Sequence, residues 1–194
     1  MGSKLRFLCV IFGAALIGSA LLLFHENRLE SQSAGKQTEV ILEQLQNLLP
    51  THGSPATQTL SSDTPNTLVV DGKEYIGAVR LVPFDLTLPV MANWSYLDLK
   101  IAPCRYSGSV TSDDLVIMAH NYEAHFGVLG KLNPGDLIEF TDAAGEIHRY
   151  RVETVEVLQP SDICEMTAGV YALTLFTCTY GGENRVTVRC SRLF

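Results

Sequence analysis

The chain has 194 residues, of which 46% are hydrophobic and 18% are charged, so it can build a core and is not disordered throughout. Its length favours one folded domain with an appended segment over two full domains. Its formal net charge of -7 excludes a general nucleic-acid binder, because such binding depends on Lys and Arg facing phosphates.

The first feature along the chain is an apolar run over residues 7–24, FLCVIFGAALIGSALLLF, which carries no charge. As a helix it would rise roughly 27 Å, close to the hydrocarbon thickness of a bilayer. Lys4 and Arg6 precede it. They predict a single-pass anchor in the cell membrane, with a cytoplasmic N-terminus and the folded domain extracellular. A cleaved signal peptide is the alternative, although Ser31 and Ser33, which could flank the cut, lie well beyond the run.

A second helical pattern follows the anchor. Over residues 34–49, apolar side chains recur at helical spacing and predict a stalk helix that Pro50 ends. Residues 50–67 are rich in Pro, Ser, Thr and Gly, which is typical of a flexible linker. We therefore expect three parts: an anchor with its flank (1–33), a stalk helix with a linker (34–67) and a folded domain (68–194).

From residue 68 the pattern changes to short β-like runs separated by turn residues. Strands are expected over residues 75–81, 115–120, 137–141, 147–157, 171–178 and 185–190. Turn formers stand between them, for example at residues 133–136 and 181–182. Short strands at this frequency predict a mainly β domain, built as an antiparallel barrel or a sandwich.

The C-terminal end carries residues suited to chemistry. If Leu173 and Leu175 point into the core, Cys178 lies on the outward face of the same strand. A hairpin through the glycines at 181–182 would bring Cys178 close to Arg185, at the start of the next strand. A guanidinium beside a thiol favours the thiolate, or stabilises the oxyanion formed when that thiolate attacks a carbonyl.

A catalytic cysteine also needs a proton carrier, and His120 is the best candidate. It ends the apolar run LVIMAH and opens a turn, where a rigid strand can present a side chain to a cleft. His25 flanks the anchor, His52 lies in the linker and His148 belongs to a charged strand. His125 remains as a second base or as a loop residue near the cleft.

These residues resemble the sortases, a family of membrane-anchored cysteine transpeptidases of mainly Gram-positive bacteria. The family signature is TLxTC on one strand, an Arg opening the next strand and a His at the end of an earlier strand. This sequence has TLFTC at 174–178, RVTVR at 185–189 and AHN at 119–121. The resemblance covers roughly residues 75–194. It implies the sortase fold, a closed β-barrel of about eight strands preceded by the transmembrane helix and the short stalk helix.

The resemblance also implies an activity. Cys178 would attack an LPxTG-like signal near the C-terminus of a secreted protein and form a thioacyl enzyme. His120 would protonate the leaving amine and deprotonate the incoming one, and Arg185 would hydrogen-bond the oxyanion. The acceptor would be an amine of a cell-wall precursor or of a pilin. No cofactor, metal ion or nucleic acid is implied. Three further residues are expected at the substrate: Thr177, Arg189 and His125.

Several alternatives stay open at this point. Arg189 lies on the same strand face as Arg185 and competes with it for the catalytic role. Trp94 and Tyr96 either line the groove or lie at an edge of the core. The other cysteines of the domain are buried hydrophobes or disulfide partners: Cys104, Cys164 and Cys190. Acidic loop residues bind calcium or only form turns, and their spacing matches no EF-hand loop: Asp113, Asp114, Asp136 and Asp142.

Three other functions compete with transpeptidation. One is a hydrolytic cysteine peptidase of the same fold, which would transfer the acyl group to water. Another is a non-catalytic, membrane-anchored module that binds a peptide in the same groove. The last is a structural protein whose helix at 34–49 mediates assembly.

Overall fold

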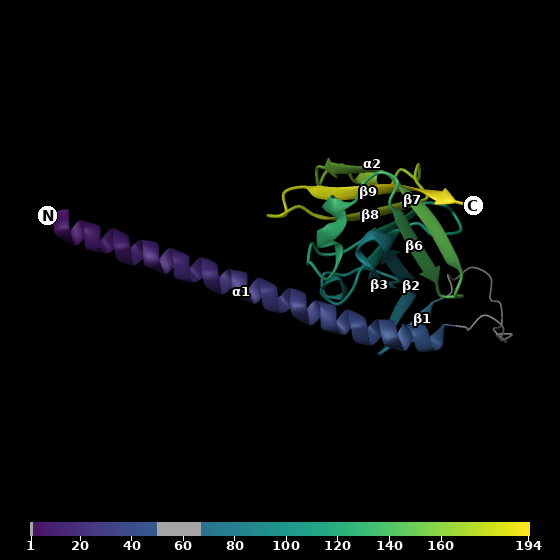
Figure 1. The fold of residues 1–194 in the computed structure, drawn as a ribbon, viewed down its shortest axis with the longest axis horizontal. Helices are drawn as coiled ribbons and strands as arrows, with labels where there is room; N and C mark the ends of the chain where they lie inside the picture. Colours follow the sequence, from purple (N-terminus) through teal and green to yellow (C-terminus); the bar gives the residue numbers. More distant parts are fainter. Residues whose placement is uncertain (1, 50–66) are drawn as a thin grey trace. The chain divides into compact units, whose positions relative to one another are not determined.

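The structure is a computed structural model that describes residues 2–49 and 67–194, so the predicted linker lies almost entirely outside the described residues. The chain forms two compact units, Met1–Ser33 and Ala34–Phe194. Helix α1 (Gly2–Leu48) supplies the first unit and the beginning of the second (Figure 1). The predicted anchor and stalk helices are therefore parts of one α-helix. Residues 25–33, which connect them, contain neither Pro nor Gly to interrupt it.

The first unit consists of the apolar part of α1. Its large side chains are exposed, among them Phe7, Phe12, Leu21 and Phe24. The helix is long and apolar enough to cross a membrane, and it lies near the N-terminus. Apolar side chains left uncovered over such a length fit a hydrocarbon environment, so this helix is a candidate membrane span.

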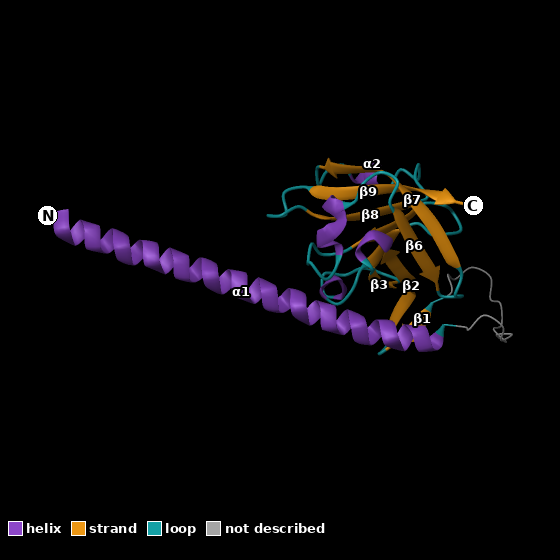
Figure 2. Cartoon of the chain, viewed as in Figure 1, coloured by secondary structure: helices purple, strands orange, loops and turns teal. Residues whose placement is uncertain are grey.

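The second unit is built on one sheet (Figure 1, Figure 2). Its strands are β1 (Leu68–Val70), β2 (Lys73–Leu81), β3 (Leu86–Met91), β4 (Cys104–Ser107), β5 (Leu115–Met118), β6 (Leu137–Asp142), β7 (Ile147–Leu158), β8 (Leu173–Cys178) and β9 (Arg185–Leu193). Short helices connect some of them: η1 (Val82–Phe84), η2 (Asp98–Lys100), η3 (Phe126–Lys131) and α2 (Ile163–Met166).

The sheet closes into a barrel. The strand order is β1-β2-β3-β4-β5-β8-β9-β7-β6, and β6 also pairs with β2. With this second pairing, the eight strands numbered β2 through β9 form a closed circuit. Strand β1 extends the sheet from β2. The prediction of a closed barrel of about eight strands is confirmed. Gly77 lies at the seam, where a Cβ would lie 2.0 Å from the backbone oxygen of Thr141, so only glycine allows β2 and β6 to approach this closely.

The barrel is mixed rather than antiparallel throughout, because β3–β4 and β5–β8 are parallel pairs. Parallel neighbours need a long crossover connection. Between β5 and β8 the connection is long and contains the whole β6–β7 hairpin. The six strands predicted from the sequence correspond to β2 and β5 to β9. Three strands were missed: β1, β3 and β4. Pro89 within β3 and Pro103 before β4 gave those segments the pattern of a turn.

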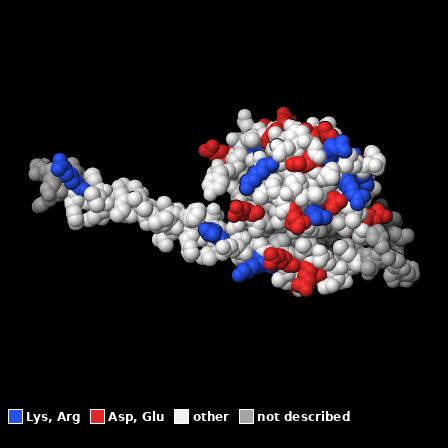
Figure 3. Space-filling view, viewed as in Figure 1, with Lys and Arg blue, Asp and Glu red and all other residues white. Residues whose placement is uncertain are grey.

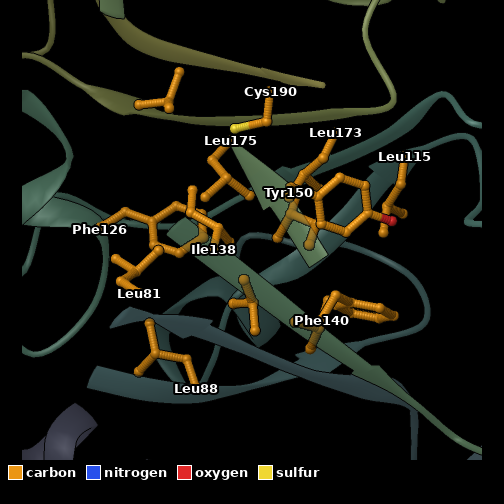
Figure 4. Packing of buried hydrophobic residues seen from close by; sticks show 14 of the residues in the cluster. Leu81, Leu88, Leu115, Phe126, Ile138, Phe140, Tyr150, Leu173, Leu175 and Cys190 are labelled. Carbon is orange, nitrogen blue, oxygen red and sulfur yellow. The ribbon is translucent and has the colours of Figure 1, made fainter. Parts of the chain in front are cut away.

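The barrel interior fixes which residues of β8 and β9 face outward. Leu173 and Leu175 on β8 and Val188 on β9 are fully buried among aromatic and aliphatic side chains (Figure 4). The stick view places Leu173 and Leu175 near Tyr150 and Ile138 in this core. Because side chains alternate along a strand, Thr174, Phe176 and Cys178 lie on the outer face of β8, as the sequence predicts.

A second hydrophobic cluster attaches the end of α1 to the barrel. Ile41 and Leu45 are buried and pack against the neighbouring strands and η2. Their partners in this cluster are Val70, Tyr75, Met91, Leu99, Ala102 and Cys104. Residues 34–48 therefore form part of the compact second unit.

Candidate active site

The cysteine and the arginine singled out in the sequence lie at opposite positions of two paired strands. Cys178 is the last residue of β8, Arg185 is the first of β9, and the two are register partners. The predicted hairpin is therefore confirmed. Its turn is closed by a hydrogen bond from the Thr179 N–H to the Asn184 carbonyl oxygen (2.9 Å). Gly181 and Gly182 have φ values of 97° and 81°, the left-handed region that favours glycine.

His120 follows β5, the neighbour of β8 on its other side. In the parallel β5–β8 pairing, Leu115 is opposite Leu173 and Met118 is opposite Phe176. Two side-chain bonds extend this register past the end of β5. Thr177 Oγ1 donates to the Ala119 oxygen (2.8 Å), and Asn121 Nδ2 donates to the Thr179 oxygen (3.4 Å), both with a sequence separation of 58. The same separation places His120 in register with Cys178.

His120, which follows β5, thus lies in line with Cys178 at the end of β8 and Arg185 at the start of β9. All three are half-buried. The Nη1 group of Arg185 donates to the backbone oxygens of Gly182 (3.0 Å) and Asn184 (3.1 Å), which fixes the guanidinium at its own turn. A thiol, an imidazole and a guanidinium at neighbouring register positions are the kinds of group that acyl transfer through a thioester uses.

Each of the five cysteines is a free thiol, but their environments differ. Burial raises the pKa of Cys104 to about 12 and also raises the pKa of Cys190. Both thiols therefore stay protonated and unreactive at neutral pH. Cys178 is half-buried, whereas Cys9 and Cys164 are exposed. Of the half-buried and exposed thiols, Cys178 is the one with a guanidinium as its register partner.

A buried apolar cluster lies on the outer side of the barrel, beside the strand end that carries Cys178. Phe176, two residues before Cys178 on the same face, packs with Val116, Leu158 and Met166. Tyr106 meets the Phe176 ring edge-on, with ring centroids 5.4 Å apart. This outer cluster was not predicted, because its members come from four separate strands or helices and form no local pattern.

The outer cluster continues into an open cavity of about 440 Å³. Trp94, which is 41% exposed, stacks on Tyr106 with ring centroids 6.0 Å apart. The cavity is lined by Ala92, Asn93, Trp94, Arg105, Tyr106, Ser107 and Gly108. The sequence left open whether Trp94 and Tyr96 line a groove or lie at an edge of the core. Trp94 lines this cavity, and Tyr96 contacts the Trp94 ring edge-on.

The three residues expected at the substrate have partners inside the protein. Thr177 is buried and its hydroxyl donates to Ala119. Arg189 is 4% exposed and is held by Glu156 and by the backbone of α2. His125 is fully buried against Thr38 of α1. Their contact with a substrate stays a prediction.

One group of side chains has the composition of a metal site. The ligand atoms of Asp142, Glu146 and His148 lie within 4.8 Å of one another. His148 Nδ1 lies 2.8 Å from Nη2 of Arg192, which can only donate, so Nδ1 accepts and Nε2–H donates to Asp142 (2.8 Å). Both ring nitrogens of His148 are therefore occupied by protein groups.

Figure 3 shows acidic and basic side chains interspersed on the visible face of the second unit.

The chain was compared with known proteins. A family model described as Sortase domain matches residues 81–193, a range that contains His120, Cys178 and Arg185. None of the curated proteins matches the chain.

Several solved structures are similar to it. Sortase C1 from Streptococcus suis has 26% sequence identity and a TM-score of 0.52, over 62% of this chain and 73% of that one. A sortase D5 transpeptidase from Clostridium perfringens has 18% identity and a TM-score of 0.64, over 82% of this chain and 99% of that one. Sortase C from Streptococcus pneumoniae has 22% identity and a TM-score of 0.56, with coverages of 86% and 89%. At these identities the last two support the fold.

Proposed function

Because this chain belongs to the sortase family, we propose that it is a membrane-anchored cysteine transpeptidase in which Cys178 is the nucleophile. The observation that carries this proposal is the alignment of His120, just after β5, with Cys178 on β8 and Arg185 on β9. The sequence left open whether Arg185 or Arg189 is catalytic. Arg185 is the register partner of Cys178, and this favours Arg185 for the role.

The reaction proceeds in two halves. The Cys178 thiolate attacks the carbonyl carbon of the scissile peptide bond, and Arg185 stabilises the oxyanion of the tetrahedral intermediate. The C–N bond breaks as His120 delivers a proton to the leaving amine, and a thioester remains on Cys178. An acceptor amine then attacks the thioester, loses a proton to His120 and forms the new amide. The free thiolate is thereby regenerated.

The open cavity beside the outer cluster is the proposed path for the sorting signal. An extended peptide lying along the exposed Trp94 and the half-buried Tyr106 would place apolar side chains there and its scissile bond at Cys178. The buried Phe176 and Met166 would support this surface from beneath. Burying one such side chain is worth about 1.5–3 kcal/mol, enough to discriminate an LPxTG-like signal from a polar tail. Trp94 and Tyr106 extend the surface away from the thiol.

The proposed location follows from α1. Residues 1–33 form the anchor, with Lys4 and Arg6 on the cytoplasmic side and the barrel outside the membrane. Substrates are then secreted proteins with a C-terminal sorting signal, and acceptors are amines of a cell-wall precursor or of a pilin. The Streptococcus pneumoniae sortase C structure concerns pilin substrate specificity, and the Clostridium perfringens enzyme is a transpeptidase.

The test uses the full chain in detergent micelles with fluorogenic sorting-signal peptides and two amine acceptors, triglycine and a lysine-containing pilin peptide. We expect a mass-identified adduct between the signal and one acceptor. Cys178→Ala should abolish it, whereas Cys164→Ala, which removes an exposed thiol, should not. Cleavage without an adduct would favour the hydrolytic peptidase. A protein that binds the peptides with unchanged affinity after Cys178→Ala, and never cleaves them, would be the binding module.

A further inference from the structure

The last turns of α1 pack against the loop that follows His120. Four α1 residues at helical spacing are buried in the second unit: Ala34, Thr38, Ile41 and Leu45. A Cβ on Gly35 would lie 3.0 Å from the Cβ of Ala124, so the helix and this loop approach each other closely. Residues 34–45 therefore reach both the second hydrophobic cluster, through Ile41 and Leu45, and the His120 loop.

A buried hydrogen bond joins the helix to the loop. Thr38 Oγ1 lies 3.2 Å from the Ile101 carbonyl oxygen and 3.3 Å from His125 Nε2. The carbonyl oxygen can only accept, and the hydroxyl has one proton, so Thr38 donates to Ile101 and His125 Nε2–H donates to Thr38. Within the described residues, Nδ1 of His125 has no hydrogen-bond partner. A neutral ring with its proton on Nε2 fits this environment.

The loop between the two histidines is tightly folded. Phe126 N–H donates to the His120 oxygen (3.2 Å), and His125 N–H donates to the Tyr122 oxygen (2.9 Å). The Tyr122 ring contacts both imidazoles, with ring centroids 4.9 Å from His120 and 5.5 Å from His125. A continuous series of contacts therefore leads from α1 through His125 and Tyr122 to His120.

We propose that Thr38 and His125 are positioning residues that hold Tyr122, and through it the His120 imidazole, in place beside Cys178. This inference rests on the proposed function, because it assigns His120 the proton transfer. Proton transfer depends on donor and acceptor positions to a fraction of an ångström, so a shifted imidazole lowers the rate without weakening substrate binding. Thr38 would then connect α1, the continuation of the anchor, to the position of the His120 imidazole.

The test compares helix variants in the full chain in detergent micelles. Thr38→Val removes the hydroxyl at nearly constant volume, and we expect kcat about tenfold lower with KM within twofold of the parent value. His125→Phe, which keeps a ring but removes the N–H, should show the same pattern. Thr38→Ser keeps the hydroxyl and should restore kcat to within threefold. Ile41→Val, which trims a buried α1 residue that packs in the second cluster, should leave kcat unchanged.

A second measurement does not depend on turnover. The imidazole C–H resonances of His120, assigned with His120→Gln, should move in Thr38→Val and stay in place in Ile41→Val. Unchanged kcat and unchanged His120 resonances in a destabilised Thr38→Val protein would overturn the proposal, because the contact would then be structural only. If the parent chain lacks transpeptidase activity, the proposed function fails, and the resonances still decide whether Thr38 positions His120.

Discussion

Arg189 on β9 donates a hydrogen bond from Nη1 to the backbone oxygen of Met166, 3.2 Å away on α2. Its Nη2 donates to the Glu165 oxygen (2.9 Å), and its Nε to Glu156 on β7 (2.8 Å). Met166 in turn packs on Phe176 in the outer cluster. One buried guanidinium therefore fixes the β7–β8 connection against the buried cluster that lies beneath the surface proposed to bind the sorting signal.

Replacing Arg189 should consequently affect stability and substrate binding together. Arg189→Met removes a buried guanidinium whose hydrogen bonds hold Glu156 and the backbone of α2, and we expect a loss of roughly 2 kcal/mol in the free energy of unfolding. KM for a sorting-signal peptide should rise more than kcat falls, since Met166 loses its support. Denaturant unfolding and steady-state kinetics measure both effects. Arg149→Met, at an exposed arginine paired with Glu139, is the control and should change neither by much. A kcat loss alone for Arg189→Met would contradict this interpretation.

Arg185 should behave in the opposite way. Arg185 is half-buried and its Nη1 group donates to backbone oxygens of its own turn, so Arg185→Ala should cost less than about 1 kcal/mol of stability. If it stabilises the oxyanion, kcat should fall about 10²–10³-fold. Single-turnover kinetics of thioester formation measure the loss directly. A fall of less than threefold would remove Arg185 from the proposed mechanism.

These two arginines also show how far the sequence could be interpreted. The segments TLFTC and RVTVR predicted two strands. They also predicted that Cys178 and Arg185 face outward, because side chains alternate along a strand with a period of two. That rule gives Arg185 and Arg189 the same outward face. It could not show that α2, which lies in a segment without strand or helix periodicity, covers Arg189 and leaves Arg185 half-buried at the start of β9.

The parallel pairing of β5 with β8 could not be predicted from the sequence for a related reason. Its partners are separated by 58 residues, and no local pattern encodes so distant a register. The contact between Thr38 and His125 spans 87 residues, so no local sequence pattern could predict it either. The stalk pattern did predict a helix, and its Ile41 and Leu45 are buried, but Thr38 is a polar residue that the apolar stripe leaves out.

The thiols should differ in reactivity according to burial. With iodoacetamide at neutral pH, we expect the native protein to be alkylated at Cys178 and Cys164, while Cys104 and Cys190 stay unmodified because burial raises their pKa. Peptide mass spectrometry distinguishes the sites. Unfolding in guanidinium should make both buried thiols react within minutes, which is the internal control. Labelling of Cys190 in the native protein at the rate of Cys164 would contradict the burial seen here.

Acid should weaken the fold through His125. Burial, and then the nearby His120, lower the pKa of His125 from 6.5 to about 4. Above pH 6.5 the ring is neutral in both the folded and the unfolded chain, so this residue adds no pH dependence. Between pH 6.5 and 4 the unfolded chain binds a proton that the folded chain excludes. Stability therefore falls by up to about 1.4 kcal/mol per pH unit, or about 3 kcal/mol in all.

Carboxylates titrate in the same range, so the measurement is a difference between two proteins. In the double variant Thr38→Val with His125→Phe, an apolar pair replaces the hydrogen bond, which should cost little at pH 7. Unfolding midpoints of the parent chain and this variant, recorded from pH 7.5 to 4.5, should diverge as the pH falls, with the variant losing less stability. Parallel curves would mean that His125 is protonated in the folded chain as readily as in the unfolded one. The Thr38 contact would then not require the neutral ring.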